Sequence, residues 1–515
     1  MALAAWEGPR EGTAAVVTAK QDQPRTPDEQ DVPDPQRWKA LSVCLLIGFM
    51  TLLDISIVNV ALPSIREGID AGQAGLQWVV SGYALAFGLL LVPAGRIGDE
   101  RGRRPVFIGG LVVFLVASAV CGLAPDERVL IVARLVQGLG GGVITPQIAG
   151  LIQELFRGAE RGKAFGLLGS TIGLGTAVGP VLGGALIALF GAEHGWRAVF
   201  FVNLPIGLVA LPFALKLIPR SPSGQSRTHD YDPVGVVLLA AALVLVLLPL
   251  VERSQISAGL RWGLLGCAAV VLAVFVLWER RYARKGKEPE VLLELFTQRS
   301  YTLGSSIGLL YFAGFTSIFF ILTLYLQQGL AYSALQAGLA VTPFALGSAV
   351  ASAVGGRQVS RFGQPLVAAG VALVLVGLVA ALVAAHPVPG RGVALALAVP
   401  LLVAGIGSGL VISPNQTLAL SEVPVRFSGS AAGVLQTGQR VGSALGIALI
   451  GGVFFAGVSG GTGGPAERFG NGFRAGLLVT IAFVGATLLL AVVDLALERR
   501  RRGSAKTEPA PTMAA

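Results

Sequence analysis

The sequence predicts an all-α polytopic membrane protein, with two bundles of six helices and two extra helices between them. Three observations carry this prediction: an apolar composition, fourteen stretches long enough to cross a bilayer, and an internal repeat. Of the 515 residues, 53% are hydrophobic and 13% are charged, whereas soluble domains average about 45–50% apolar and about 25% charged residues. Many of the 70 glycines lie within apolar runs, where small residues let helices pack closely in lipid.

The fourteen stretches match the roughly 20 residues that a helix needs to cross about 30 Å of hydrocarbon. In chain order they are 40–63, 75–95, 105–124, 129–152, 164–190, 197–217, 233–251, 261–278, 301–327, 336–356, 366–385, 391–418, 430–456 and 473–496. The expected domains are a disordered cytoplasmic tail over 1–39, a six-helix bundle over 40–217, two extra helices and a cytoplasmic linker over 218–299, a second six-helix bundle over 300–496 and a cytoplasmic tail over 497–515.

The placement of Lys and Arg predicts the orientation, because positive residues resist translocation across the bilayer. Most of the 39 Lys and Arg residues lie in the two tails and in the loops that follow even-numbered helices. Both termini are therefore expected in the cytoplasm. High Ala, Gly, Arg and Val usage is typical of high-GC bacteria, so the expected location is a bacterial inner membrane.

The net charge of +10 does not indicate a nucleic-acid partner, since the basic residues are scattered between apolar runs and not interleaved with aromatics. The three cysteines lie far apart in apolar stretches, so neither disulfides nor a metal cluster is expected. No cofactor is expected either.

The chain also repeats itself. Residues 95–105, GRIGDERGRRP, recur weakly at 356–365 as GRQVSRFGQP. Five glycines recur 267 positions further on: Gly162, Gly166, Gly175, Gly179 and Gly184 match Gly429, Gly433, Gly442, Gly446 and Gly451. Parallel repeats of this kind place a site near the membrane midplane, between the two bundles.

Four sequence motifs occur within the first five predicted helices and the loops between them. The loop after the second helix reads GRIGDERGRR over 95–104, the fourth helix holds Arg134 followed by Gln137 and Gly138, the fifth reads GTAVGPVLGG over 175–184, and the first reads LDISIVNVALP over 53–63. Together these resemble the motifs of the major facilitator superfamily over about residues 40–496. The first-helix motif resembles that of its fourteen-helix drug:proton antiporters.

This resemblance implies the major facilitator fold and no enzymatic activity. It implies proton-coupled export of small molecules, namely drugs or antibiotics, by alternating access across the cytoplasmic membrane. The implied partners are protons, the lipid bilayer and a small amphipathic or apolar substrate, and the protein is expected to work as a monomer.

The charged loop is the candidate conformational latch between the two halves on the cytoplasmic side. Its members are Gly95, Asp99, Gly102, Arg103, Arg104 and Glu154. Asp99 can face the positive N-terminus of a neighbouring helix, and the arginines can pair with carboxylates such as Glu154. The alternative is that the arginines only fix orientation. Ser360 replaces Asp99 in the second repeat, so that copy is expected to be weaker.

The fifth helix carries the candidate antiporter motif, formed by Gly175, Gly179, Pro180, Gly183 and Gly184. The glycines clear one helix face for close contact, and the proline favours a kink. Ordinary small-residue packing explains the glycines equally well.

Asp54 and Arg134 are the candidates for proton coupling. A carboxylate near the middle of a membrane helix is costly, so Asp54 should face a cavity or a partner. Arg134 can stabilise its ionised form. The alternative is a structural hydrogen bond between helices. A second intramembrane cation, Arg440, lies in the thirteenth stretch.

A binding cavity needs apolar and aromatic walls with a few polar groups. The candidates are Trp78, Tyr83, Asn203, Tyr311, Phe315, Phe319, Asn415 and Gln416.

Two other function classes compete with export. A proton-coupled importer of a small metabolite shares the fold, but it would not need the exporter-like glycine motif or fourteen helices. A polytopic receptor or membrane enzyme would need a large extramembrane domain or a catalytic constellation, and the sequence holds no HExxH, GxSxG or Walker motif. Sodium remains an alternative to protons.

Overall fold

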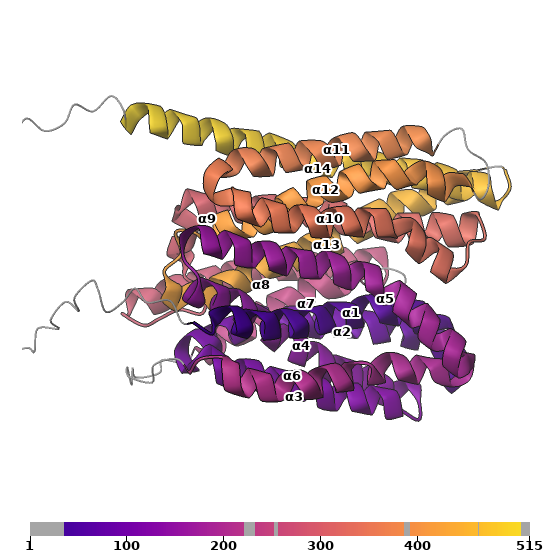
Figure 1. Ribbon diagram of the computed structural model, residues 1–515, viewed down its shortest axis with the longest axis horizontal. Helices are drawn as coiled ribbons and strands as arrows, with labels where there is room; N and C mark the ends of the chain where they lie inside the picture. Colours follow the sequence, from indigo (N-terminus) through magenta and orange to yellow (C-terminus); the bar gives the residue numbers. More distant parts are fainter. Residues whose placement is uncertain (1–34, 221–231, 252–255, 386–391, 462, 506–515) are drawn as a thin grey trace, which may run out of the picture. The chain divides into compact units, whose positions relative to one another are not determined.

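The computed structural model describes residues 35–220, 232–251, 256–385, 392–461 and 463–505. Regular structure within these residues is helical (Figure 1). The α-helices are α1 (Arg37–Ile69), α2 (Gln73–Arg101), α3 (Arg103–Leu123), α4 (Glu127–Leu155), α5 (Gly158–Phe201), α6 (Asn203–Leu217), α7 (Pro233–Val251), α8 (Ala258–Arg284), α9 (Arg299–Leu324), α10 (Ala334–Phe362), α11 (Gln364–Ala384), α12 (Val393–Ala419), α13 (Ser428–Gly460) and α14 (Pro465–Ala505). Most of the two expected tails, 1–39 and 497–515, lies outside the described residues.

Fourteen helices in the described ranges are long and apolar enough to cross a membrane, which confirms the predicted number. Helix α5 covers the fifth span and the start of the sixth, and it has a kink at Gly191, whose φ of 77° is not helical. The fifth span therefore ends at Gly191 and the sixth starts at Glu193. Short turns complete the chain: η2 (Leu293–Thr297), η3 (Tyr325–Gly329) and η5 (Val425–Phe427).

The helices form two six-helix bundles with α7 and α8 as the extra pair. The most extensive contacts between the bundles are those of α5 with α10 and of α2 with α13. The repeated glycines occupy equivalent contacts in these pairs. Gly162 lies against α10 and Gly429 lies against α2, whereas Gly175 lies against α1 and Gly442 against α9. The first two glycines of each repeat thus contact the other bundle, and the later ones contact their own bundle, except that Gly184 lies near Leu335 of α10.

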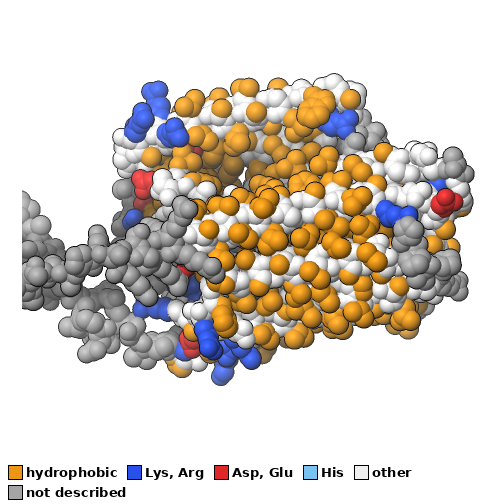
Figure 2. Space-filling model, turned by 90° about the horizontal axis from the view of Figure 1, so that it is seen from above, with side chains coloured by type: hydrophobic (Ala, Val, Ile, Leu, Met, Phe, Trp, Pro, Cys, Tyr) orange, Lys and Arg blue, Asp and Glu red, His pale blue; other side chains and the backbone are white. Residues whose placement is uncertain are grey.

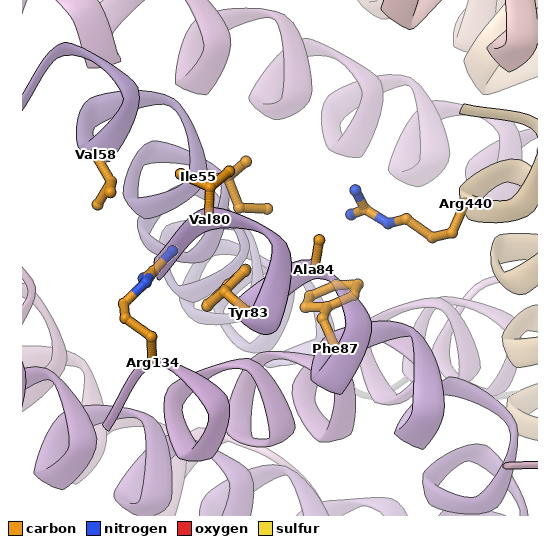
Figure 3. Close-up of a pocket in the computed structure, with 8 residues that line it drawn as sticks. All are labelled: Ile55, Val58, Val80, Tyr83, Ala84, Phe87, Arg134 and Arg440. Carbon is orange, nitrogen blue, oxygen red and sulfur yellow. The ribbon is translucent and has the colours of Figure 1, made fainter. Parts of the chain in front are cut away.

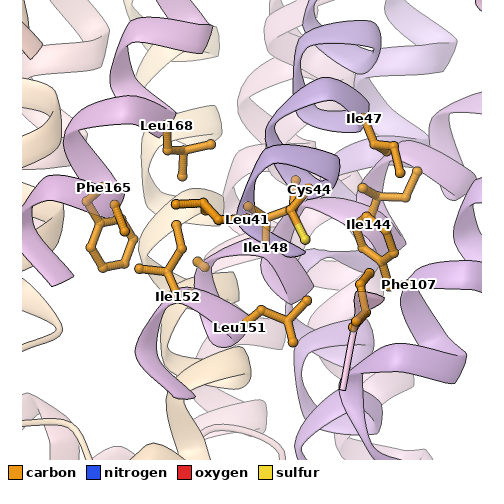
Figure 4. Close-up of a cluster of buried hydrophobic side chains, with 14 of the residues drawn as sticks. Leu41, Cys44, Ile47, Phe107, Ile144, Ile148, Leu151, Ile152, Phe165 and Leu168 are labelled. Carbon is orange, nitrogen blue, oxygen red and sulfur yellow. The ribbon is translucent and has the colours of Figure 1, made fainter. Parts of the chain in front are cut away.

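Apolar packing holds the first bundle together at the end where α1 begins. Figure 4 shows side chains of α1, α3, α4 and α5 that meet in one buried cluster, including Leu41, Phe107, Ile148 and Phe165. On the outside, hydrophobic side chains cover most of the face seen in Figure 2, and Lys and Arg gather toward its two ends. This pattern suits a protein whose middle lies in hydrocarbon.

The extra helices pack against the junction of the two bundles. Helix α7 contacts α8, α2 and α13. Leu239 and Leu243 of α7 form a buried cluster with Val92 of α2 and Phe275 of α8. The extra pair therefore covers the α2–α13 contact from one side.

Candidate functional site

A buried ion pair lies inside the first bundle. Asp54 of α1 is fully buried and its carboxylate accepts hydrogen bonds from three side chains. Arg134 of α4 donates at 2.7 Å, Gln137 of α4 at 2.9 Å and Asn203 of α6 at 2.8 Å. The structure therefore brings together both residues predicted for proton coupling, and it adds two amides to them.

Arg134 is held on every side. Its Nε donates to the carbonyl of Val79 at 3.0 Å, and a terminal nitrogen donates to Gln137 at 2.7 Å. Its guanidinium carbon lies 4.1 Å from the centroid of the Tyr83 ring. Gln137 and Asn203 in turn both donate to the Ser118 hydroxyl, at 2.7 and 2.9 Å. This network crosses α1, α2, α3, α4 and α6.

Sequence reasoning missed part of this network. From the sequence, Gln137 is one residue of the motif that begins at Arg134, and the spacing of three places both residues on one helix face. Ser118 sits in an apolar run with no signal of its own. Asn203 was expected to line the cavity, but its amide points to Asp54 and Ser118 instead.

Hydrogen-bond donors surround the carboxylate of Asp54. Its three side-chain partners all donate to it, and one of them carries a permanent positive charge. Such charge-assisted hydrogen bonds are about twice as strong as neutral ones.

A cavity of about 50 Å³ lies beside the ion pair (Figure 3). It is lined by Ile55, Val58, Val80, Tyr83, Ala84, Phe87, Arg134 and Arg440. Arg134 reaches it from α4 in the first bundle, and Arg440 reaches it from α13 in the second. The site therefore lies where the two bundles face each other.

Of the eight predicted cavity residues, Tyr83 lines this cavity. Phe315 and Phe319 of α9 instead form an aromatic group with Tyr311 and with Phe344 of α10. The amide of Asn415 donates to the carbonyl of Gly304 and so joins α12 to α9. Gln416 is buried and Trp78 is half-buried, and neither lines the cavity of Figure 3.

The candidate latch residues meet where α2 ends and α13 begins. The Asp99 carboxylate accepts hydrogen bonds from the backbone N–H groups of Gly429 at 2.9 Å and Ser430 at 2.8 Å. These two groups belong to the first turn of α13, whose N-terminus carries the positive end of the helix dipole. Asp99 thus lies where the sequence predicted, at a helix N-terminus of the other bundle.

Arg103 binds both bundles. It contacts Asp99 at 2.9 Å and forms an ion pair with Glu154 of α4. It also donates to the Val425 carbonyl and to the Ser428 hydroxyl, both at 2.8 Å. Arg104 was expected to pair with a carboxylate, but it donates to the carbonyl of Leu215 within its own bundle. Of the two arginines, Arg103 therefore bridges the bundles, whereas the Arg104 bond to Leu215 stays within one bundle.

Two glycines allow this close contact. A Cβ at Gly95 would overlap the backbone carbonyl of Gly429. Gly102 has a φ of 92° and connects α2 to α3, a conformation that a residue with a side chain rarely adopts.

The antiporter-motif glycines form a packing surface. Gly175, Gly179 and Gly183 lie against α1, and the hydroxyl of Ser56 donates to the Gly175 carbonyl at 2.9 Å. Pro180 contacts Gly338 of α10, and Gly184 lies near Leu335. The motif in α5 therefore packs on α1 at Ser56, two residues after Asp54, and also on α10 of the other bundle.

A second charged cluster, the linker cluster, lies where the chain after α8 meets α2. It consists of Asp232, Glu279 and Glu290 with Arg96, all buried. Trp278 donates to both carboxylate oxygens of Asp232, at 3.0 and 2.8 Å. Burial raises the pKa of Glu290 to about 8, with Glu279, Glu100 and Asp232 adding to the rise and Arg96 opposing it.

Comparison with known proteins places the chain in a family. A description of the Major Facilitator Superfamily matches residues 44–447. The chain is 35% identical over 428 residues, 82% of its length and 73% of the relative's, to the "Probable actinorhodin transporter" of Streptomyces coelicolor. It is 34% identical over 498 residues, 93% of its length and 96% of the relative's, to the "Puromycin resistance protein pur8" of Streptomyces alboniger.

A solved structure shares the fold. The human organic anion transporter MFSD10 (TETRAN) is 16% identical and superposes with a TM-score of 0.61, over 88% of this chain and 100% of that one. Together, the fourteen helices, the paired bundles and the sequence match over most of the chain lead to one conclusion. The chain belongs to the major facilitator superfamily of membrane transporters.

Proposed function

We propose that this protein exports small molecules, in the class of drugs or antibiotics, across the cytoplasmic membrane in exchange for protons. The observation that carries the proposal is the pairing of Asp54 with Arg134 at 2.7 Å beside a cavity between the bundles. The curated relatives, named as an actinorhodin transporter and a puromycin resistance protein, support the substrate class. Both termini lie in the cytoplasm, and the monomer is the working unit.

The proton step takes place at Asp54. Desolvation makes a lone buried carboxylate costly, whereas the donors around Asp54 compensate its charge. When a proton binds, the attraction to Arg134 weakens and the guanidinium is free to turn toward the cavity that it lines. When the proton leaves, the ion pair re-forms. The protonation state of Asp54 is thereby linked to the positive charge that Arg134 presents to a substrate in the cavity.

The latch supplies the conformational step. Its contacts join Asp99 and Arg103 of the first bundle to the first turn of α13 in the second, so this conformation is closed at the cytoplasmic end. Opening toward the cytoplasm requires these contacts to break. The small number of contacts, all near one point, suits a joint that opens and re-forms in each cycle of alternating access.

The proposal is tested in two stages. Expression in a bacterium that lacks its own efflux pumps should raise tolerance to at least one compound of a panel of antibiotics and cationic dyes. Inverted vesicles with an acidic lumen should then accumulate that compound, and a protonophore should abolish the accumulation. Accumulation that ignores the pH gradient but follows a sodium gradient would overturn proton coupling. Uptake in the opposite direction would favour an importer.

A further inference from the structure

Arg440 reaches the cavity from the second bundle and is not explained by the proton step. It lies twelve residues after Ser428, the first residue of α13, and therefore about 18 Å along the helix at a rise of 1.5 Å per residue. Its guanidinium carbon lies 4.5 Å from the centroid of the Phe87 ring in α2. The residue thus sits deep between the bundles, opposite Arg134 (Figure 3).

The charge of Arg440 is not matched by a carboxylate in the described part of the chain. Arg134, Arg103 and Arg96 each pair with an acidic side chain, at distances of 2.7 to 2.9 Å. Arg440 has no such ion pair with a described residue, and its contact is the face of Phe87. An arginine keeps its proton in proteins, so the positive charge remains.

Apart from Arg440, the cavity lining is mostly apolar. It consists of the two charged side chains of Arg134 and Arg440, the ring of Tyr83, and five apolar side chains, Ile55, Val58, Val80, Ala84 and Phe87. Asp54 neutralises Arg134. One uncompensated positive charge therefore faces an apolar space near the membrane midplane, where charged side chains are rare and mark transport pathways.

We propose that Arg440 binds an acidic group, a carboxylate or an ionised phenol, carried by an aromatic or apolar substrate. The inference rests on the proposed export function, because it names the class of molecule that this function carries. The guanidinium fork binds a carboxylate through two parallel hydrogen bonds. The surrounding aliphatic and aromatic side chains take the apolar body.

The size of the cavity fits a site that holds the acidic group and only a small part of the apolar body. About 50 Å³ accommodates the acidic group and a few neighbouring atoms, not a whole drug-sized molecule. The remainder of the substrate needs the space that forms when the two bundles move apart. Because Arg440 belongs to the second bundle and Arg134 to the first, an anion between them contacts both moving parts.

Binding to the purified protein in lipid nanodiscs tests the inference without requiring transport. The probes are 2-naphthoate and its uncharged amide, 2-naphthamide, which differ in the acidic group alone. Calorimetry with empty nanodiscs as the blank should show at least about tenfold tighter binding of the acid, as expected for a charge-assisted pair. Equal affinities, or no binding of either probe, would refute the inference.

Variants separate binding from a structural role. Arg440→Gln should remove the preference for the acid, and Arg440→Lys should keep part of it, because lysine retains the charge without the fork. Arg197→Gln is the matched control, because Arg197 donates to the Gly122 and Ala124 carbonyls and does not line the cavity, and this variant should leave the preference intact. If Arg197→Gln lost the preference as Arg440→Gln does, or if Arg440→Gln still preferred the acid, Arg440 would not be the ligand of the acidic group. A preserved preference in a protein that shows no pH-driven export would instead refute the proposed function alone.

Discussion

The carboxylate of Asp99 accepts a hydrogen bond of 2.8 Å from the backbone N–H of Ser430, 331 positions further along the chain. This contact joins the end of α2 in the first bundle to the first turn of α13 in the second. A negative charge at a helix N-terminus is stabilising, by up to about 2 kcal/mol where the site is partly buried. We therefore expect the proposed closure at the cytoplasmic end to depend on the charge of Asp99.

We predict that Asp99→Asn shifts the protein toward the cytoplasm-open conformation by about tenfold, since asparagine keeps the shape but loses the charge. Spin labels at Ala159 and Ser421, both exposed at the cytoplasmic end, report the change as a longer distance between the bundles. The labelled protein carries Cys267→Ser, because Cys267 is exposed whereas Cys44 and Cys121 are buried.

Asp126→Asn is the matched control. Asp126 caps α4 by accepting from the N–H groups of Arg128 and Val129 within its own bundle. The Asp126→Asn variant should weaken α4 slightly and leave the distance between the two spin labels unchanged. The assignment of Asp99 to the latch would be wrong if Asp99→Asn lowered the substrate affinity while the label distances and the alternation rate stayed normal. Arg103→Ala should behave like Asp99→Asn, because Arg103 contacts the same turn.

Three glycine-to-alanine variants distinguish contacts between bundles from contacts within one. At Gly95 the new Cβ would overlap the Gly429 carbonyl of the other bundle, and at Gly446 it would overlap the Ala313 carbonyl of the same bundle. Gly95→Ala should open the cytoplasmic end with little change in melting temperature. Gly446→Ala should destabilise the second bundle by about 1–3 kcal/mol, the usual cost of overpacking.

Gly109→Ala serves as the control for this series, since a Cβ there meets nothing within 4 Å. Melting curves and the label distances measured above give both readouts. A similar loss of stability in Gly95→Ala and Gly446→Ala would mean that the bundles do not separate as units.

The sequence predicted the helices well because their signal is local. Fourteen apolar runs, the glycine repeat and the site of Asp99 each follow from composition or short spacing. Predictions that needed the mutual arrangement of helices did less well. Asn203 was assigned to the cavity, yet its amide binds Asp54, because only the crossing of α6 with α1 decides where that side chain points.

Arg440 shows the same limit. From sequence it is one polar residue in a glycine-rich helix, and its partner Phe87 lies far away on α2. The meeting of α2 with α13 depends on the pairing of the two bundles, which no local pattern encodes. The role of Ser118 could not be predicted for the same reason, because it depends on Gln137 and Asn203, which belong to other helices.

The linker cluster predicts a pH dependence of stability. The native pKa of Glu290, about 8, lies above its usual 4.5, so the native state holds this proton more tightly than the unfolded chain does. The stabilising contribution is therefore full at pH 4.5 and below, and it is lost as the pH rises toward 8. Glu290→Gln should flatten this part of the pH–melting profile and raise the melting temperature at pH 8.5.

Glu294→Gln is the control for the cluster, because Glu294 lies exposed in the same linker. It should leave the profile of the wild-type protein unchanged. If Glu290→Gln melted with the wild-type pH dependence, the buried carboxyl would not be the titrating group.

The Asp54–Arg134 pair leads to a prediction about coupling. Asp54→Asn should abolish pH-driven accumulation in inverted vesicles, because asparagine retains the size and hydrogen-bonding capacity of the carboxyl but cannot take up and release a proton. Facilitated movement down a substrate gradient should persist, since alternation does not require protonation at this site. The control is Asp494→Asn, a carboxylate that is also buried and paired with an arginine, Arg299, but lies toward the C-terminal end of α14. That variant should keep pH-driven transport at equal expression. Undiminished accumulation by Asp54→Asn would make the pair a structural tie between helices, and Glu154 or Glu422 would become the carboxylates to test next.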